Sequence, residues 1–259
     1  MDEHNKNIVD QFTKQAVPFA EKMTAQSGSE LLRMMVAASG ATDKDTVLDV
    51  ACGPGLVACA FARVAKEVTG IDLTPAMIER AQLLQKREKL SNLRWQIGDV
   101  LPLPYPNAAF SLTVTRFSFH HFLNPGAVLQ EMIRVTSIAG RVLVSDVYTT
   151  DNSRQSEAYN RMEKLRDPSH VRALALSELQ SLFQNSGLQN VRTEFFKLHM
   201  EMEQQLSASF PNPGDEEILR QIFRKDVKDQ TLGMDTRLEN GKIYFSYPIA
   251  VIVGTKTQK

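Results

Sequence analysis

The stretch TVLDVACGPGLVACA, residues 46–60, decides the fold of this chain. Its β-branched, apolar first part ends in Gly53-Pro-Gly55, and apolar residues at helical spacing follow from Leu56 to Lys66. Glycines suit the turn because the backbone there has to bend sharply and leave room for a ligand. The stretch therefore predicts a strand, a tight loop and a helix.

The same alternation of strand and helix repeats along the chain. Thr74-Pro75 and Asn124-Pro125 each indicate a helix start, because Thr and Asn cap helices and proline suits the first helical position. Further strands are expected at residues 68–73, 93–97, 110–117, 141–147, 191–198 and 247–255. This alternation predicts a doubly wound α/β fold with a parallel sheet covered on both faces.

Segments outside this alternation predict additions to the core. Residues 8–38 predict two short helices broken by Pro18 and Gly28, and residues 200–245 predict helical stretches around Pro211-Asn-Pro-Gly214. The expected organisation is a helical lid at residues 1–40, a core at 41–199 and 246–259, and a substrate cap inserted at 200–245.

Two helices are also expected after the fifth strand. One is a polar helix at 153–166. The other follows Ser177-Glu-Leu-Gln180, which predicts a capping box, and Gly187 should close it.

Composition limits the classes of partner and compartment. Lysine plus arginine equal aspartate plus glutamate at 30 each, so no net field favours nucleic acid or an anionic membrane surface. Only two cysteines are present, and no His, Cys and carboxylate grouping has metal-site spacing. The start MDEHNKN lacks signal-peptide features, and no uncharged stretch could span a bilayer. We expect a cytoplasmic protein without a metal, with a small-molecule partner; a homodimer stays open.

Acidic residues stand at three successive strand ends, where an open α/β sheet binds its ligands: Asp49, Asp72 and Asp99. A carboxylate at Asp49 suits a ligand with a cationic amino group and would repel a pyrophosphate in the same loop. S-adenosylmethionine (SAM) has such an amino group and no phosphate. However, Gly53-x-Gly55-x-x-Ala58 also matches the dinucleotide motif, and Asp72 stands at about the distance of its ribose-binding acid, so NAD stays an alternative.

Three longer stretches resemble the successive motifs of class I SAM-dependent methyltransferases. They are LDVACGPG at 48–55, GIDLTPAMIERA at 70–81 and GDVLPLPYPNAAFSLTVTRFSFHHFLNP at 98–125. The resemblance covers about residues 40–150 and points to the ubiquinone/menaquinone biosynthesis methyltransferase-like family. It implies a Rossmann-like, seven-stranded, mostly parallel sheet whose last strand is antiparallel, which ordinary dinucleotide folds lack.

The resemblance also implies a cofactor site that would bind SAM and release S-adenosylhomocysteine (SAH). Its expected residues are Asp49, Ala51, Gly53, Gly55, Asp72, Leu73, Met77, Asp99, Val100 and Arg116. Asp49 and the two glycines would line the methionine part, and Asp72 would bind the ribose. Asp99 with Val100 would bind the adenine. Ala51 departs from the family, which more often has glycine there, and Arg116 could instead meet a substrate acid or cover the sheet edge.

A general base is optional in such a reaction, because the sulfonium methyl is already electrophilic and placement supplies most of the catalysis. The catalytic candidates are His120 and His121, after the fourth strand, and His170, after the fifth, since histidine titrates near neutrality. The histidines could instead only bond backbone or lie in a solvated turn. The expected substrate-binding residues are Phe12, Phe19, Phe119, Tyr148 and Tyr159, although aromatics at such spacings also fill cores.

The sequence thus favours an enzyme that methylates an O, C or N atom of a small, partly apolar molecule. A NAD-dependent oxidoreductase is the alternative enzyme. A non-catalytic nucleoside-binding protein is an alternative of another class.

Overall fold

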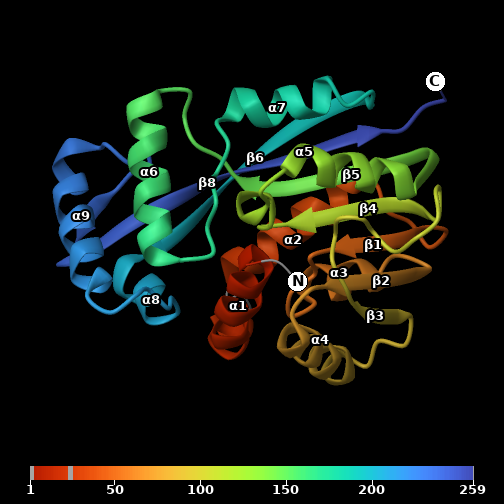
Figure 1. Ribbon diagram of the computed structural model, residues 1–259, viewed down its shortest axis with the longest axis horizontal. Coiled ribbons are helices and arrows are strands. Elements are labelled where there is room, and N and C mark those ends of the chain that lie inside the picture. The colour runs from red at the N-terminus through yellow and green to blue at the C-terminus, as the bar shows by residue number, and fades with distance from the viewer. Residues whose placement is uncertain (1–2, 23–25, 259) are drawn as a thin grey trace.

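A central mixed sheet organises the computed structural model, which describes the backbone of residues 3–22 and 26–258 and the side chains of residues 3–15 and 29–258 (Figure 1). Its strands are β1 (Thr46–Val50), β2 (Glu67–Asp72), β3 (Leu93–Ile97), β4 (Phe110–Arg116), β5 (Thr136–Val147), β6 (Gln189–Glu201), β7 (Arg237–Glu239) and β8 (Lys242–Thr255). They follow the order β3-β2-β1-β4-β5-β8-β6, and β7 pairs with β8.

The strand directions confirm the predicted sheet. β1 to β5 pair in parallel, whereas β8 runs antiparallel to both β5 and β6. The short β7 was not predicted and forms a hairpin with β8, in which Glu239 pairs with Lys242. Asn240 and Gly241 make its two-residue turn, both with positive φ, as a hairpin turn that matches strand twist requires.

Helices cover both faces of the sheet. They are α1 (Glu3–Lys22), α2 (Gln26–Ser39), α3 (Leu56–Ala62), α4 (Pro75–Glu88), α5 (Pro125–Val135), α6 (Ser153–Arg166), α7 (Leu176–Gln184), α8 (Met202–Ser207) and α9 (Asp215–Asp229), with a 3-10 turn η1 (Phe119–His121). Because side chains alternate along a strand, Val47 joins the core cluster that contains Phe61 of α3, and Leu48 joins the one that contains Leu129 of α5. No helix among these is long and apolar enough to cross a membrane.

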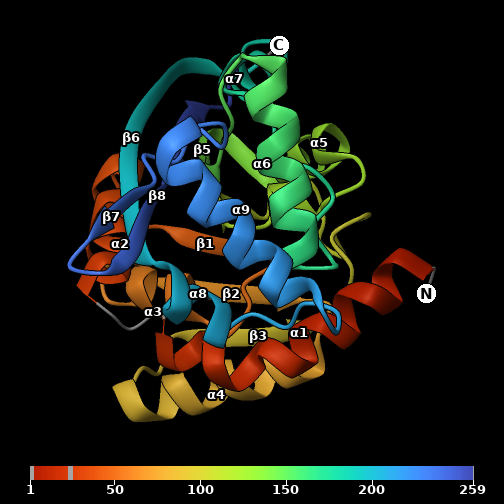
Figure 2. The same ribbon diagram turned by 90° about the vertical axis from the view of Figure 1, so that its left-hand side faces the viewer.

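The carboxyl ends of the parallel strands face a separate group of helices. Figure 1 shows α6, α8 and α9 together beyond these ends, and Figure 2 shows α6 and α9 side by side. α6 lies within the range expected for the core, yet it packs against α9 of the expected cap. The helical layer over the strand ends is therefore built from both ranges.

Two local predictions were wrong. α1 continues through Pro18 and α2 through Gly28, so neither residue breaks a helix. Proline removes only one backbone hydrogen bond, and Gly28 stands in the first turn, whose amides have no partner within the helix. The capping box is also shifted, because α7 starts at Leu176 and the Glu178 carboxylate accepts from the Ala175 amide at 2.9 Å. Ser177 instead bonds Asp151.

Two predicted helix starts were confirmed. The Asn124 side chain accepts from the Ala127 amide at 3.0 Å, with Pro125 at the first position of α5. Thr74 precedes Pro75 at the start of α4, although its side chain makes no capping bond. The Thr74 amide instead donates to Asp72 at 2.8 Å, which ties the start of the helix to the end of β2.

Candidate active site

A cavity of about 260 Å³, which we call the first cavity, opens at the carboxyl ends of β1, β2 and β4. The predicted cofactor residues that line it are Asp49, Ala51, Gly53, Asp72, Leu73, Met77, Asp99, Val100 and Arg116. Gly55 lies outside this lining. Its φ of +83° needs glycine, and a Cβ there would approach Trp95 at 2.7 Å and Ala81 at 2.8 Å, so Gly55 serves close packing of the loop.

Asp49 is a buried acid without a hydrogen bond. Its side chain belongs to a residue that is 1% exposed, and neither carboxylate oxygen has a partner among the described residues. Burial raises the pKa of Asp49 to about 8, although the nearby Arg116 opposes the rise. Because Arg116 compensates the buried carboxylate only in part, a cationic amino group at this position would stabilise its charged form. The site therefore fits the amino group of SAM.

Asp72 connects the glycine loop to the next helix. Its Oδ2 accepts from the Gly53 amide at 2.8 Å and its Oδ1 from the Thr74 amide at 2.8 Å. Burial raises the pKa of Asp72, although the two hydrogen bonds oppose the rise. Because each carboxylate oxygen has two lone pairs, Asp72 can still accept from ribose hydroxyls while it fixes the loop.

Helix α1 closes over the first cavity. The side-chain amide of Asn5 donates to Asp99 Oδ2 at 2.7 Å, and His4 Nε2 donates to the His121 carbonyl at 3.0 Å. The Leu101 amide donates to the other Asp99 oxygen at 3.1 Å. His4 and Asn5 were not predicted for this site, because nothing local in the sequence places the first helix over the segments that follow β3 and β4.

A second cavity, of about 110 Å³, adjoins the first. Phe12, Phe117 and His121 line both. Phe117 holds a φ of +55°, which a bulky residue rarely adopts, at the point where β4 leads into η1. The shared walls place the contents of the two cavities next to each other.

His120 lines the second cavity and is held by Asp146. His120 Nδ1 donates to Asp146 Oδ1 at 2.6 Å, and Asp146 Oδ2 accepts from the Ser118 amide at 2.9 Å and the Phe119 amide at 2.6 Å. Burial favours the neutral imidazole, but Asp146 outweighs burial and raises the pKa of His120. No described residue bonds His120 Nε2. The pair has the arrangement of a base oriented by a carboxylate.

The other two predicted histidines differ in position. His121 Nδ1 donates to the Ser169 carbonyl at 3.1 Å, and burial, followed by the charge of His120, lowers its pKa to about 4. His170 is fully buried and lines neither cavity; its Nε2 donates to Asn160 at 2.8 Å. Burial, followed by His120 and His121, lowers the pKa of His170 to about 2. His121 and His170 are therefore neutral near pH 7.

The predicted substrate-binding aromatics are mostly core residues. Phe12 lines both cavities and meets the His121 ring edge-on at 5.0 Å. Phe119 and Tyr159 are buried in the core, and Tyr148 packs against Phe195; the residues found to line the two cavities do not include them. The side chain of Phe19 lies outside the described residues.

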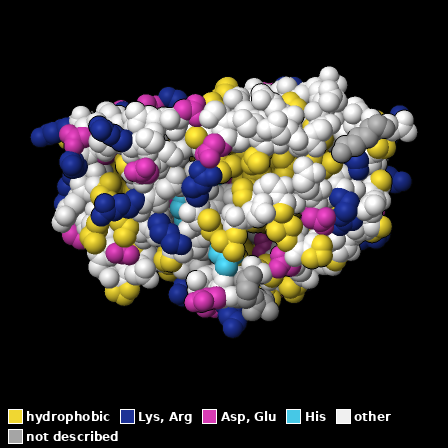
Figure 3. Space-filling view, turned by 45° about the horizontal axis from the view of Figure 1, so that its top comes forward, with side chains coloured by type: hydrophobic (Ala, Val, Ile, Leu, Met, Phe, Trp, Pro, Cys, Tyr) yellow, Lys and Arg dark blue, Asp and Glu magenta, His cyan; other side chains and the backbone are white. Residues whose placement is uncertain are grey.

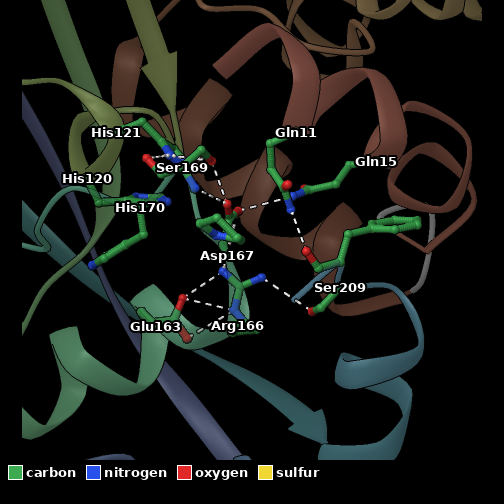
Figure 4. A network of polar contacts seen from close by, with 12 residues as sticks. Gln11, Gln15, His120, His121, Glu163, Arg166, Asp167, Ser169, His170 and Ser209 are labelled. Carbon is green, nitrogen blue, oxygen red and sulfur yellow. Dashed lines mark hydrogen bonds and ion pairs between the residues drawn. The ribbon is translucent and has the colours of Figure 1, made fainter. Parts of the chain in front are cut away.

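A polar network lines the second cavity (Figure 4), and the sequence pointed only to its stretch at residues 166–170. Arg166 Nη2 donates to Glu163 Oε2 at 2.7 Å, and the Tyr247 hydroxyl donates to Glu163 Oε1 at 2.9 Å. Asp167 accepts from the Ser169 amide at 2.9 Å and from the Gln15 amide group at 3.2 Å. These groups come from α1, from α6 with the turn after it, and from β8, which local sequence patterns do not bring together.

Comparison with known proteins identifies the family. A sequence profile described as "Methyltransferase domain" matches residues 41–224. The chain is 32% identical over 177 residues to the uncharacterized methyltransferase YcgJ of Bacillus subtilis, an alignment that spans 68% of this chain and 70% of that protein. This chain belongs to the methyltransferase domain family. It is a class I SAM-dependent methyltransferase, as its motifs predicted, which excludes the oxidoreductase alternative.

Three further comparisons agree with the methyltransferase family and fold. The crystal structure of YcgJ has a TM-score of 0.82 and 26% identity to this methyltransferase, and covers 89% of this chain and 100% of that one. A demethylmenaquinone methyltransferase of Deinococcus radiodurans is 37% identical over 100 residues, which are 38% of this chain and 41% of that protein. The geranyl diphosphate C-methyltransferase of Streptomyces coelicolor, crystallised with SAH, shares the fold at 14% identity, with a TM-score of 0.62 over 89% of this chain and 79% of that one.

Proposed function

We propose that this methyltransferase transfers the methyl group of SAM to an O, C or N atom of a small, partly apolar molecule bound in the second cavity. The observation that carries the proposal is the unpartnered Nε2 of His120 in a cavity that shares Phe12, Phe117 and His121 with the first. The volume of about 110 Å³ is below the roughly 300 Å³ of pockets that take drug-sized ligands, which supports a small acceptor.

The first cavity would hold the cofactor. Asp49 would pair with the amino group, Asp72 would accept from the ribose hydroxyls, and Asp99 would accept from the adenine amino group. When bound, SAM supplies an electrophilic methyl group, and its transfer leaves SAH. Asp99 Oδ2 already accepts from the Asn5 side-chain amide, a donor of the same chemical type as the adenine amino group.

His120 would act as the general base. Its Nε2 would take the proton from the acceptor atom, and Asp146 would hold the tautomer with the proton on Nδ1 and stabilise the imidazolium that forms. The apolar walls, including Phe12 and Phe117, would exclude water and hold the acceptor next to the methyl group.

The segments that cover the two cavities would control access to them. Residues 1–40 would form a lid, since α1 bonds Asp99 and Asp167 with its side chains. Residues 200–245 would form the substrate cap, and the Gln11 amide group already donates to the Phe210 carbonyl at 3.0 Å. Residues 41–199 and 246–259 would be the catalytic core.

The proposal includes a cytoplasmic enzyme with a small-molecule partner. Buried, unpaired thiols at Cys52 and Cys59 support a reducing compartment. Basic and acidic side chains are mixed over the face shown in Figure 3, in agreement with the zero net charge, which supports the absence of nucleic acid as a partner. The proposal is compatible with a homodimer.

The test begins with calorimetric titration of SAH and of NADH. The wild type should bind SAH and not NADH, and Asp72→Ala should lose nucleoside binding. Unchanged affinity in Asp72→Ala would remove the ribose assignment. A library of small alcohols, phenols, enols and amines is then screened for SAH release; tight SAH binding without turnover of any compound would instead support the non-catalytic alternative.

A further inference from the structure

The second cavity carries more negative than positive charge. Three carboxylates line it or bond directly to its lining: Asp146, Glu163 and Asp167. Among the residues whose side chains the structure describes, the cations are Arg166 and, when protonated, His120, because His121 and His170 are neutral near pH 7. Within that set the three carboxylates outnumber the cations in either state of His120. The nearby Lys164 is exposed and donates instead to the carbonyls of Pro168 and His170.

The bonding pattern leaves Asp167 with only a share of one cation. Arg166 donates from Nε and Nη2 to Glu163, and the same Nη2 forms a longer ion pair with Asp167 Oδ2 at 4.0 Å, so one guanidinium serves two carboxylates. Asp146 is paired with His120. Asp167 accepts only from neutral donors, the amide and hydroxyl of Ser169 and the side-chain amide of Gln15. Since Asp167 is 2% exposed, water screens its charge weakly.

An anionic acceptor would be poorly placed in this cavity. Arg166 is its only guanidinium among the described lining residues, and Glu163 accepts from that group at 2.7 Å, so an anion at Arg166 would also meet Glu163. Burying an anion among unneutralised carboxylates is unfavourable, whereas a cation there completes the charge balance. His120, only 8% exposed, lines the same cavity, and no described residue bonds its Nε2, so in the neutral imidazole this nitrogen is available to accept a proton from a ligand.

We propose, on the basis of the proposed function, that the methyl acceptor is a small primary or secondary amine that binds as its ammonium ion, with Asp167 as its charge partner. Its apolar substituent lies against Phe12, Leu198 and Met200. One ammonium proton moves to His120 Nε2. The nitrogen lone pair then forms the bond to the methyl carbon, while the carbon–sulfur bond breaks with its electron pair staying on sulfur. The product is a methylated ammonium ion beside neutral SAH.

The test is calorimetric binding to the preformed SAH complex. The probes are matched sets of amine, alcohol and carboxylate that share one apolar group, with butyl and benzyl as the two groups. We expect the amine of at least one set to bind about tenfold or more tightly than both its alcohol and its carboxylate, a difference of about 1.4 kcal/mol. The proposal is overturned if no set shows this order.

A variant assigns the preference to Asp167. Asp167→Asn should lower the amine preference about tenfold and leave SAH affinity unchanged, whereas Asp235→Asn, the same change at an exposed ion pair with Lys197, should alter neither. An unchanged preference in a folded Asp167→Asn would refute the role of Asp167, and the wild-type order decides the proposal if that variant does not fold. Wild type that fails to bind SAH would instead refute the proposed function.

Discussion

Asp49 makes the stability of the ligand-free protein depend on pH. Its pKa rises from an ordinary 3.8 to about 8 in the folded state because burial outweighs the opposing charge of the nearby Arg116. Between these two pKa values the folded protein binds up to one more proton at Asp49 than the unfolded chain does. The contribution of Asp49 to stability is therefore fully present below about pH 4 and is lost as pH rises toward 8. We predict that Asp49→Asn, which keeps the side-chain volume and cannot ionise, removes this loss.

The magnitude follows from the linkage relation. Between about pH 6 and about pH 8 the wild type should lose about 2 kcal/mol of unfolding free energy through Asp49, or roughly 4–8 °C in melting temperature for a chain of this size. The loss of unfolding free energy over the same pH range should be smaller by that amount in Asp49→Asn. Titrating groups distant from Asp49 act in both proteins and cancel in the difference.

The assay is urea unfolding and thermal melting of both proteins at several pH values, with and without SAH. SAH should reduce the wild-type loss, because its amino group would pair with the ionised carboxylate. Asp43→Asn, the same change at an exposed acid, serves as the control and should behave as wild type. Equal pH slopes for wild type and Asp49→Asn would refute the view that Asp49 is a protonated buried acid.

Three further predictions concern His120, Gly55 and Ala51. His120→Gln should lower kcat by about 10²–10⁴ with SAH affinity unchanged, and should abolish a rise in wild-type kcat with a midpoint above pH 6.5; the exposed His199→Gln is the control, and a similar loss there would contradict the assignment. Gly55→Ala should destabilise by about 2–4 kcal/mol in urea unfolding, because its positive φ and the contact with Trp95 both oppose a Cβ. Ala51→Gly should remove the backbone strain of a φ of +54° and raise the free energy of unfolding by between zero and about 1 kcal/mol. A clear decrease in urea unfolding would contradict this and show that the Ala51 methyl contributes to packing.

The sheet and the first cavity could be predicted because their signals are local. Asp49, Asp72 and Asp99 stand at strand ends that the hydrophobic pattern marks, and parallel strands bring those ends to one edge. The backbone also gives a physical reason for the glycine that the family more often has at position 51, since the observed φ of Ala51 is positive.

Phe12, His120 and His121 of the second cavity were among the predicted site residues, but the rest of its walls could not be predicted, because they come from distant segments. Gln15 and Asp167 are bonded across 152 positions of the chain, and no periodicity reports that approach. Burial also reversed some expectations, since Phe119 and Tyr159 serve the core. The hairpin of β7 and β8 is different: Asn240-Gly241 is a local turn signal that could have revealed it.

Helix α1 bonds to both cavities, through Asn5 at Asp99 and through Gln15 at Asp167. One helix thus contacts the proposed sites of both the methyl donor and the methyl acceptor. If α1 swings outward as a unit, both chambers open to solvent in the same movement. Release of SAH and release of the methylated product would then occur in the same opening step, and the rate at which α1 opens would set an upper limit on turnover.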